Sequence, residues 1–192
     1  MIKIGVLALQ GAFAEHMRIL RSLGAEAVAV RLPQDLKGLR GLIIPGGEST
    51  TIGKLAVQYD LITSIRRFAR AKAVWGTCAG MILMAKHVGN DQPLLGIMDI
   101  SVQRNAFGRQ IDSFETELYV SVFQDGNSKP FPAVFIRAPR LVATWDKAEV
   151  IARLLDGTPV AARQGKMMAT AFHPELSQDH RFHQFFLDFA RM

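Results

Sequence analysis

Short apolar runs and stretches with apolar residues at helical spacing alternate along the first half of the chain. Residues 2–9 (IKIGVLAL) form a nearly continuous apolar run, which is typical of a strand buried on both faces. Residues 12–24 then predict a helix that stops at Gly24, because glycine readily ends a helix. The apolar side chains at helical spacing in this segment are Phe13, Met17, Leu20 and Leu23.

The same alternation continues to residue 88. Strands are predicted at residues 26–32, 41–47 and 73–77, and helices at residues 49–59, 61–71 and 79–88. Ser49 opens the first of these helices and is a good N-cap residue. Alternating strands and helices of this kind favour a mostly parallel sheet that is covered by helices on both faces.

The pattern of apolar and polar residues changes beyond residue 95. The segments that follow are short and strand-like, and they are separated by Gly, Pro and Asp turns. A last helix is predicted at residues 180–192, with one apolar stripe made of Phe182, Phe185, Phe186 and Phe189. We find no repeat or linker, so the pattern predicts one α/β domain over residues 1–192 with a largely β second half.

Composition narrows the class of protein. Of the 192 residues, 49% are apolar and 21% are charged, which is ordinary for a globular protein and argues against disorder. A single cysteine cannot form an internal disulfide. The first residues read as a strand rather than a signal peptide, and no apolar run reaches the roughly 18 residues of a membrane helix. We therefore expect a soluble, cytoplasmic protein with no membrane partner.

The formal net charge of +6 raises the question of nucleic-acid binding. The cations are scattered, and the one dense group, residues 66–72 (RRFARAK), is typical of the solvated face of a helix. Aromatic and basic residues are not interleaved on one face, and no nucleic-acid-binding motif is present. We expect no nucleic-acid partner.

The only cysteine, Cys78, lies in the sequence GTCAG between a predicted strand and a predicted helix. This is the pattern of a nucleophile elbow, a sharp turn that lifts one side chain above the sheet and needs small neighbours such as Gly76 and Gly80. The helix N-terminus favours the reactive thiolate, and the N–H of Ala79 is a natural oxyanion donor. Taken alone, the motif fits a buried structural cysteine equally well.

The segment AFHPEL favours catalysis. Pro174 biases His173 toward an extended backbone, in which Glu175 points the same way as His173 and can hold one of its ring nitrogens. The other nitrogen is then available to take and return a thiol proton. Singly, each residue is more simply a structural histidine or a solvated acid, but the pair together with a cysteine elbow is much rarer by chance.

A third segment, IIPGGEST (residues 43–50), runs from a strand through Gly46 and Gly47 into a helix. The two glycines allow a close approach to a ligand, or N–H groups turned inward as an oxyanion site requires, although an ordinary strand-to-helix turn uses glycines too. It is not a phosphate loop, because Gly47 and Gly53 are one residue too far apart and Lys54 precedes a leucine.

Taken together, GTCAGMI, HPE and PGGEST resemble the class I, or triad, glutamine amidotransferases. Residues 5–16 (GVLALQGAFAEH), 104–115 (RNAFGRQIDSFE) and 134–139 (VFIRAP) narrow the resemblance to the branch that serves pyridoxal 5'-phosphate synthesis. It covers nearly the whole chain. The resemblance implies a flavodoxin-like fold and a glutaminase that passes ammonia to a partner synthase subunit in a hetero-oligomeric complex, without a cofactor.

The resemblance also implies roles for individual residues. Cys78 would be the nucleophile, His173 the general acid and base, and Glu175 its orienting partner. The implied contacts to the substrate L-glutamine are Gly47, Glu48, Ser49, Arg104, Ile136 and Arg137, and the oxyanion site would comprise Gly46, Gly47 and Ala79. Such a site suits glutamine, whose α-carboxylate needs cations or N–H groups and whose α-ammonium needs an acceptor.

Other interpretations remain open. The chain could serve a different synthase, such as one that forms an imidazole, or act as a non-catalytic subunit or an unrelated cysteine hydrolase. Retention of all three catalytic residues argues against a non-catalytic subunit, and the HPE segment argues against an unrelated hydrolase. His180 and His183 have i, i+3 spacing, but without a third ligand nearby they indicate a helix surface rather than a metal site.

Overall fold

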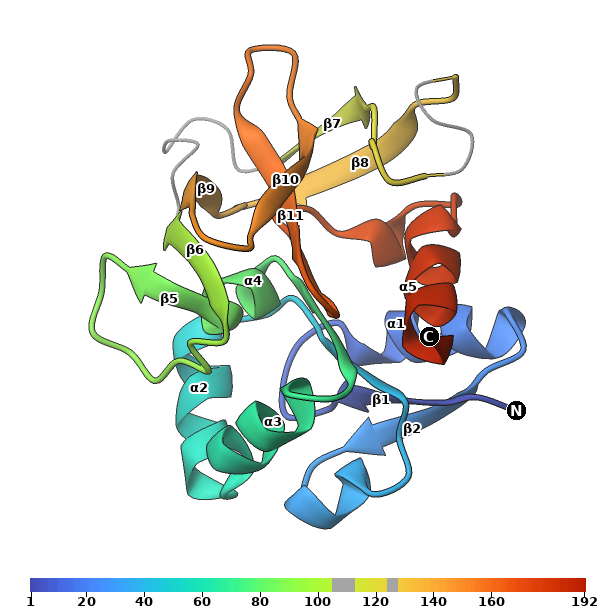
Figure 1. The fold of residues 1–192 in the computed structure, drawn as a ribbon, viewed down its shortest axis with the longest axis vertical. Coiled ribbons are helices and arrows are strands. Elements are labelled where there is room, and N and C mark those ends of the chain that lie inside the picture. Colours follow the sequence, from blue (N-terminus) through green and yellow to red (C-terminus); the bar gives the residue numbers. More distant parts are fainter. Residues whose placement is uncertain (105–112, 124–127) are drawn as a thin grey trace.

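A computed structural model describes residues 1–104, 113–123 and 128–192, and its centre is a seven-stranded sheet (Figure 1). Its strands run in the order β10-β11-β12-β4-β3-β1-β2. The parallel strands are β1 (Lys3–Leu7), β2 (Glu26–Val30), β3 (Gly41–Ile44), β4 (Ala73–Thr77) and β12 (Met167–Thr170). The antiparallel strands β11 (Pro159–Gln164) and β10 (Glu149–Arg153) extend one edge.

Helices cover both faces of this sheet (Figure 1). The helices α1 (Phe13–Ser22) and α5 (Arg181–Arg191) lie on one face, and α2 (Ser49–Gln58), α3 (Leu61–Ala69) and α4 (Ala79–Met84) on the other. Because strand side chains alternate between faces, Trp75 of β4 packs on Phe182 and Phe186 of α5, whereas Gly76 faces α4. The predicted mostly parallel α/β sheet with helices on both faces is confirmed.

The second half of the chain adds two small sheets. One joins β5 (Ala85–Val88), β6 (Met98–Gln103) and β9 (Arg140–Thr144), and the other pairs β7 (Ser113–Leu118) with β8 (Phe131–Ile136). Within the described residues, two 3₁₀ turns, η1 (Pro33–Leu36) and η2 (Pro174–Leu176), complete the elements. The largely β second half predicted from the sequence is confirmed.

The helix predicted over residues 79–88 is wrong in its second half. Helix α4 ends at Met84, and Ala85–Val88 form strand β5, which pairs in parallel with β6. The apolar spacing of this segment fits a helix, but the free energy of pairing with β6 outweighs the local preference.

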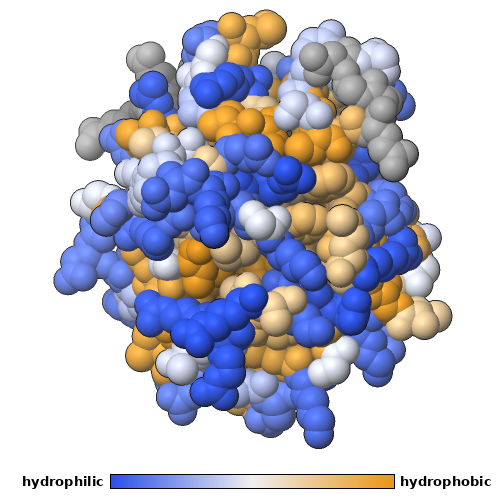
Figure 2. Space-filling view, viewed as in Figure 1, coloured by the Kyte–Doolittle hydropathy of each residue, from blue (hydrophilic) through white to orange (hydrophobic). Residues whose placement is uncertain are grey.

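The stripe of phenylalanines on α5 faces the core as predicted. Phe182 and Phe186 are completely buried, and Phe185 and Phe189 pack against the same cluster. On the outside, Figure 2 shows hydrophilic and hydrophobic residues interspersed over one face. Over the described ranges, every helix is too short or too polar to cross a bilayer.

Candidate active site

Three neighbouring parallel strands bring the sequence-predicted residues together. Strands β3, β4 and β12 are adjacent in the sheet and point the same way. Gly46 follows β3, Cys78 follows β4 and His173 follows β12, so all three lie beyond the carboxyl edge of the sheet. This edge is where open parallel sheets place their ligand sites.

Cys78 lies on the sharp strand-to-helix turn that its motif predicts. Its φ of 49° and ψ of −104° form a conformation that costs a non-glycine residue about 1–3 kcal/mol. Its backbone N–H donates to Thr170 of the neighbouring strand at 2.8 Å, which holds the turn in place. Cys78 as a whole is buried, with 7% of its surface exposed.

The glycines beside Cys78 permit this turn. A Cβ on Gly76 would lie 2.5 Å from the carbonyl carbon of Gly80, and a Cβ on Gly80 would lie 2.0 Å from the carbonyl oxygen of Ile44. No side chain fits at either distance. The close packing of α4 on the sheet therefore requires both glycines, as the sequence indicated.

His173 and Glu175 are in direct contact. The Nδ1 atom of His173 lies 2.7 Å from Oε1 of Glu175, and the carboxylate is buried. The backbone N–H of His173 donates to Val134 of β8 at 2.8 Å. The predicted contact is confirmed, but the extended backbone expected for it is wrong: Pro174 begins the 3₁₀ turn η2, because its fixed φ suits the first position of a helical turn.

The electrostatic balance at His173 favours its charged form. Burial lowers the pKa of this imidazole, but hydrogen bonds to the Cys78 thiol and to Glu175, together with the negative charge of both partners, raise it to about 10. The Cys78 thiol and the His173 imidazole are therefore arranged to share a proton, and the Glu175 carboxylate stabilises the imidazolium form of His173.

The turn after β3 approaches both reacting side chains. A Cβ on Gly46 would lie 2.5 Å from Cε1 of His173 and 3.4 Å from Cβ of Cys78. The Gly46 carbonyl accepts a hydrogen bond from the N–H of Ala12 at 3.0 Å. Among the described residues, no backbone hydrogen bond takes up the N–H of Gly47 or of Ala79.

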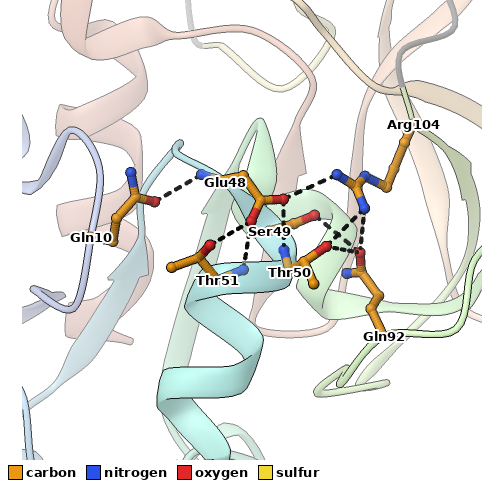
Figure 3. A network of polar contacts seen from close by, with 7 residues as sticks. All are labelled: Gln10, Glu48, Ser49, Thr50, Thr51, Gln92 and Arg104. Carbon is orange, nitrogen blue, oxygen red and sulfur yellow. Dashed lines mark hydrogen bonds and ion pairs between the residues drawn. The ribbon is translucent and has the colours of Figure 1, made fainter.

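A polar network continues from this turn (Figure 3). Arg104 donates to the Glu48 carboxylate at 3.1 Å and to Gln92 Oε1 at 3.0 Å, and the Glu48 N–H donates to Gln10 at 2.8 Å. Ser49 also donates to Gln92, at 3.1 Å. Figure 3 shows that this network joins the start of α2 to segments that are distant in sequence.

The N-cap of α2 is Glu48, which corrects the prediction of Ser49. The Glu48 carboxylate accepts the N–H groups of Thr50 and Thr51, so Ser49 becomes the first helical residue. A hydrogen bond from the Thr51 hydroxyl, with the backbone donors of Thr51 and Thr50, lowers the pKa of Glu48 to about 2. Glu48 is thus an ionised, partly exposed acceptor beside the turn.

Of the remaining predicted contacts, Ile136 borders Cys78. The carbonyl oxygen of Ile136 lies 3.9 Å from the Cys78 Sγ. Arg137 follows it with a φ of 42°, a second non-glycine residue in the left-handed region beside the site. Most of the predicted segment 104–115 lies outside the described residues; its first residue, Arg104, is placed in the network above.

Sequence reasoning missed four residues around this site, Gln10, His16, Gln92 and His183. His183 was assigned to a helix surface and is in fact completely buried, with its Nε2 2.9 Å from Nδ1 of His16. A signal was available for His16, because it lies one turn before Leu20 on the buried side of α1. Over the described residues, no group of three metal-ligating side chains comes together.

Comparison with known proteins gives consistent results. The sequence model of the SNO glutamine amidotransferase family matches residues 6–191. "Pyridoxal 5'-phosphate synthase subunit PdxT" of Herpetosiphon aurantiacus is 57% identical, covering 96% of this chain and 98% of that protein. The protein of the same name from Dehalococcoides mccartyi is 55% identical, covering 99% of this chain and 98% of its own length.

Solved structures agree with this similarity. A protein described as a glutamine amidotransferase superposes with a TM-score of 0.92 at 48% identity, over 98% of this chain and 99% of that one. A protein in the structure of PurLQS from Thermotoga maritima superposes with a TM-score of 0.73 at 16% identity, over 97% of both sequences. The second likeness concerns the fold alone.

Proposed function

Because the chain belongs to the SNO glutamine amidotransferase family, we propose that it hydrolyses L-glutamine to L-glutamate and ammonia as the glutaminase subunit of a pyridoxal 5'-phosphate synthase. The observation that carries the proposal is the grouping of three side chains: Cys78 on a strained turn, His173 beside the same glycine, Gly46, and Glu175 2.7 Å from Nδ1 of His173. This order of nucleophile, base and orienting acid is the arrangement that acyl transfer requires.

The reaction begins with the Cys78 thiolate and the His173 imidazolium. The sulfur attacks the side-chain amide carbon of glutamine and forms a C–S bond, and the carbonyl oxygen becomes an oxyanion. His173 gives its proton to the amide nitrogen, the C–N bond breaks and ammonia leaves. Water, deprotonated by His173, then attacks the thioester and releases glutamate with regeneration of the thiol.

We assign the oxyanion site to Gly46, Gly47 and Ala79. The N–H groups of Gly47 and Ala79 have no backbone acceptor among the described residues, and the turn touches both reacting side chains. The Gly46 carbonyl is held by Ala12, so a rearrangement of the Gly46–Gly47 peptide has to break one hydrogen bond. A peptide between two glycines can flip at a small cost in free energy, which makes this peptide the element that a partner would reorganise.

The charged ends of glutamine fit the rim of the site. Glu48 supplies an ionised acceptor for the α-ammonium group, and Arg104 and Arg137 supply cations for the α-carboxylate. Gly47, Ser49 and Ile136 complete the proposed contacts. Gly47 and Ser49 flank Glu48, and Ile136 directly precedes Arg137. Free ammonia in neutral water becomes ammonium, which is not a nucleophile, so transfer to the synthase has to be direct.

The test is glutamate release from glutamine by wild type and by Cys78→Ala, each with and without a pyridoxal 5'-phosphate synthase subunit. We expect turnover that needs both Cys78 and the synthase, with little release by the isolated chain. Equal turnover by Cys78→Ala would refute the triad. Equal turnover with and without the synthase would refute the dependence on a partner while leaving the glutaminase reaction intact.

A further inference from the structure

A buried chain of polar side chains lies behind Glu175, on the side away from His173. Nε2 of His16 lies 3.3 Å from Oε2 of Glu175 and 3.3 Å from the Thr77 hydroxyl. Nδ1 of the same ring lies 2.9 Å from Nε2 of His183. The side chains of His16 and Glu175 are both 0% exposed, and His183 is equally inaccessible. Three different elements, α1, η2 and α5, therefore meet at one buried polar point.

The chemistry of these atoms selects one tautomer. An unprotonated Nε2 on His16 would direct a lone pair at an oxygen of the Glu175 carboxyl group, which is an acceptor, so the proton has to be on Nε2. Nδ1 of His16 is then an acceptor, and His183 must donate to it from its own Nε2. This series of buried polar side chains ends at Nδ1 of His183, which is buried and has no hydrogen-bond partner among the described residues.

Nε2 of His16 is hydrogen-bonded to the Thr77 hydroxyl and lies equally close to the Glu175 carboxylate. Oε2 of Glu175 makes no well-aligned hydrogen bond with any described residue, and Nε2 of His16 faces both it and Thr77 at the same distance. Without this donor, one oxygen of a buried carboxylate would face no polar hydrogen, which is unfavourable for a buried charged group. Edge contacts of Trp75 with the rings of His16 and His183, at centroid distances of 5.7 and 5.0 Å, fix both imidazoles.

We propose that His16 is a positioning residue for the glutaminase reaction: its neutral imidazole donates from Nε2 to Glu175, and His183 fixes its tautomer. The inference rests on the function proposed above and extends it to two residues outside the triad. By holding Oε2, His16 keeps the carboxylate aimed at His173, which in turn keeps His173 protonated opposite Cys78.

The charges around His16 are consistent with a neutral ring. Burial lowers the pKa of His16 well below its ordinary value, and the neighbouring His183 and His173 lower it further. Burial likewise lowers the pKa of His183 to about 3, with His180 adding to the effect. The groups that face this chain are thus Glu175 from η2, His173 and Cys78 beyond it, and His183 and His180 from the α5 side.

Two substitutions of His16 separate the role of Nε2, which faces Glu175, from the role of Nδ1, which faces His183. The amide nitrogen of glutamine reaches about as far from the backbone as Nε2, so His16→Gln retains a donor for Glu175. The shorter asparagine reaches only the position of Nδ1, so His16→Asn retains a partner for His183 and loses the one for Glu175. Both variants place a neutral polar group in the space that the His16 ring occupies. The control is His87→Gln, because His87 is exposed on β5 and takes no part in the buried polar network.

The measurement is the pH profile of kcat/KM for glutamine hydrolysis by the complex with the synthase subunit. We expect His16→Asn to move the alkaline limb, where His173 loses its proton, about one pH unit toward acid. His16→Gln and His87→Gln should keep the wild-type limb. The rate of alkylation of Cys78 by iodoacetamide at pH 7 should fall severalfold in His16→Asn alone, a readout that needs neither glutamine nor the synthase.

Equal limbs in His16→Asn and His16→Gln, whether both shifted or both unshifted, would overturn the proposal and leave His16 as a packing residue. ¹⁵N spectra of the imidazoles in wild type provide a measurement that does not depend on any variant folding. They should show His16 protonated only at Nε2, and a proton at Nδ1 would overturn the proposal. An inactive wild-type complex would refute the glutaminase function itself, and the spectra would still test the tautomer.

Discussion

Replacing Gly46 with alanine adds one methyl group between the two reacting side chains. The new Cβ would lie 2.5 Å from Cε1 of His173, where ordinary contacts begin at 3.4 Å. Either the imidazole or the turn therefore has to move by about 0.9 Å. The ring cannot move freely, because Glu175 holds its Nδ1 at 2.7 Å. We expect the His173 ring to leave its position opposite Cys78.

The displacement sets the size of the effect. A misplacement of about 1 Å in a catalytic group typically costs about 100-fold in rate, which corresponds to about 2.7 kcal/mol of transition-state stabilisation. We therefore expect kcat/KM for glutamine in Gly46→Ala to be about 100-fold below wild type when both are assayed with the synthase subunit. Alkylation of Cys78 by iodoacetamide should slow as well, because that reaction depends on the His173 contact and not on the oxyanion site.

The control is Gly89→Ala. A Cβ on Gly89 meets no atom within 4 Å, so this variant adds the same methyl group without a contact and should keep wild-type activity. Thermal unfolding of both variants separates a local effect from a loss of fold. Wild-type turnover in Gly46→Ala would refute the argument, and so would an equal loss in Gly89→Ala, because neither result is compatible with a steric effect on His173.

Three further predictions follow from the same geometry. Because the pKa of His173 is raised to about 10, its native state binds the proton more tightly than the unfolded chain; the stabilisation is complete below about pH 6.5 and is lost as pH rises toward 10. Thermal unfolding from pH 6 to 10 should show this decline, and Glu175→Gln should weaken it. Gly80→Ala, whose Cβ would lie 2.0 Å from a β3 carbonyl oxygen, should lose at least about 1–3 kcal/mol in urea unfolding. Arg104→Lys keeps the charge but loses the fork that reaches Glu48 and Gln92, so KM for glutamine should rise severalfold.

Each of these has an outcome that would contradict it. A melting temperature of the wild type that is flat from pH 6 to 10 would show that His173 gains no proton affinity on folding. Wild-type stability in Gly80→Ala would mean that α4 does not pack as closely as the structure has it. An unchanged KM with a reduced alkylation rate in Arg104→Lys would place Arg104 in the support of Cys78 rather than in substrate binding.

Much of the site could be predicted because its signals are local. The GTCAG segment carries its own requirement for small residues, and His173 and Glu175 are only two positions apart, so any compact turn allows them to meet. The backbone between them was predicted less well. An extended segment and a 3₁₀ turn both permit the contact, and the fixed φ of Pro174 is compatible with either.

The misplaced elements share one cause. Residues 85–88 have apolar spacing that suits a helix, and only the presence of β6 makes them a strand. Ser49 is the better N-cap residue by type, yet Glu48 has the non-helical backbone and the reach to accept two N–H groups. In both cases two local arrangements are close in free energy, and contacts with distant segments select one of them.

The amino-acid sequence alone determined the alternation of strands and helices up to residue 84, the cysteine turn and the adjacent acid–base pair, because periodicity and short spacing are properties of neighbouring residues. Tertiary structure decided which distant residues meet: His16 and His183 are 167 positions apart, and Arg104 reaches Glu48 across 56. The spacing of His183 on its helix indicated a surface residue, and only the packing of α5 against β4 and His16 buries it. The order of strands in the sheet brings α1, η2 and α5 together, and burial then makes hydrogen bonding between their polar groups obligatory.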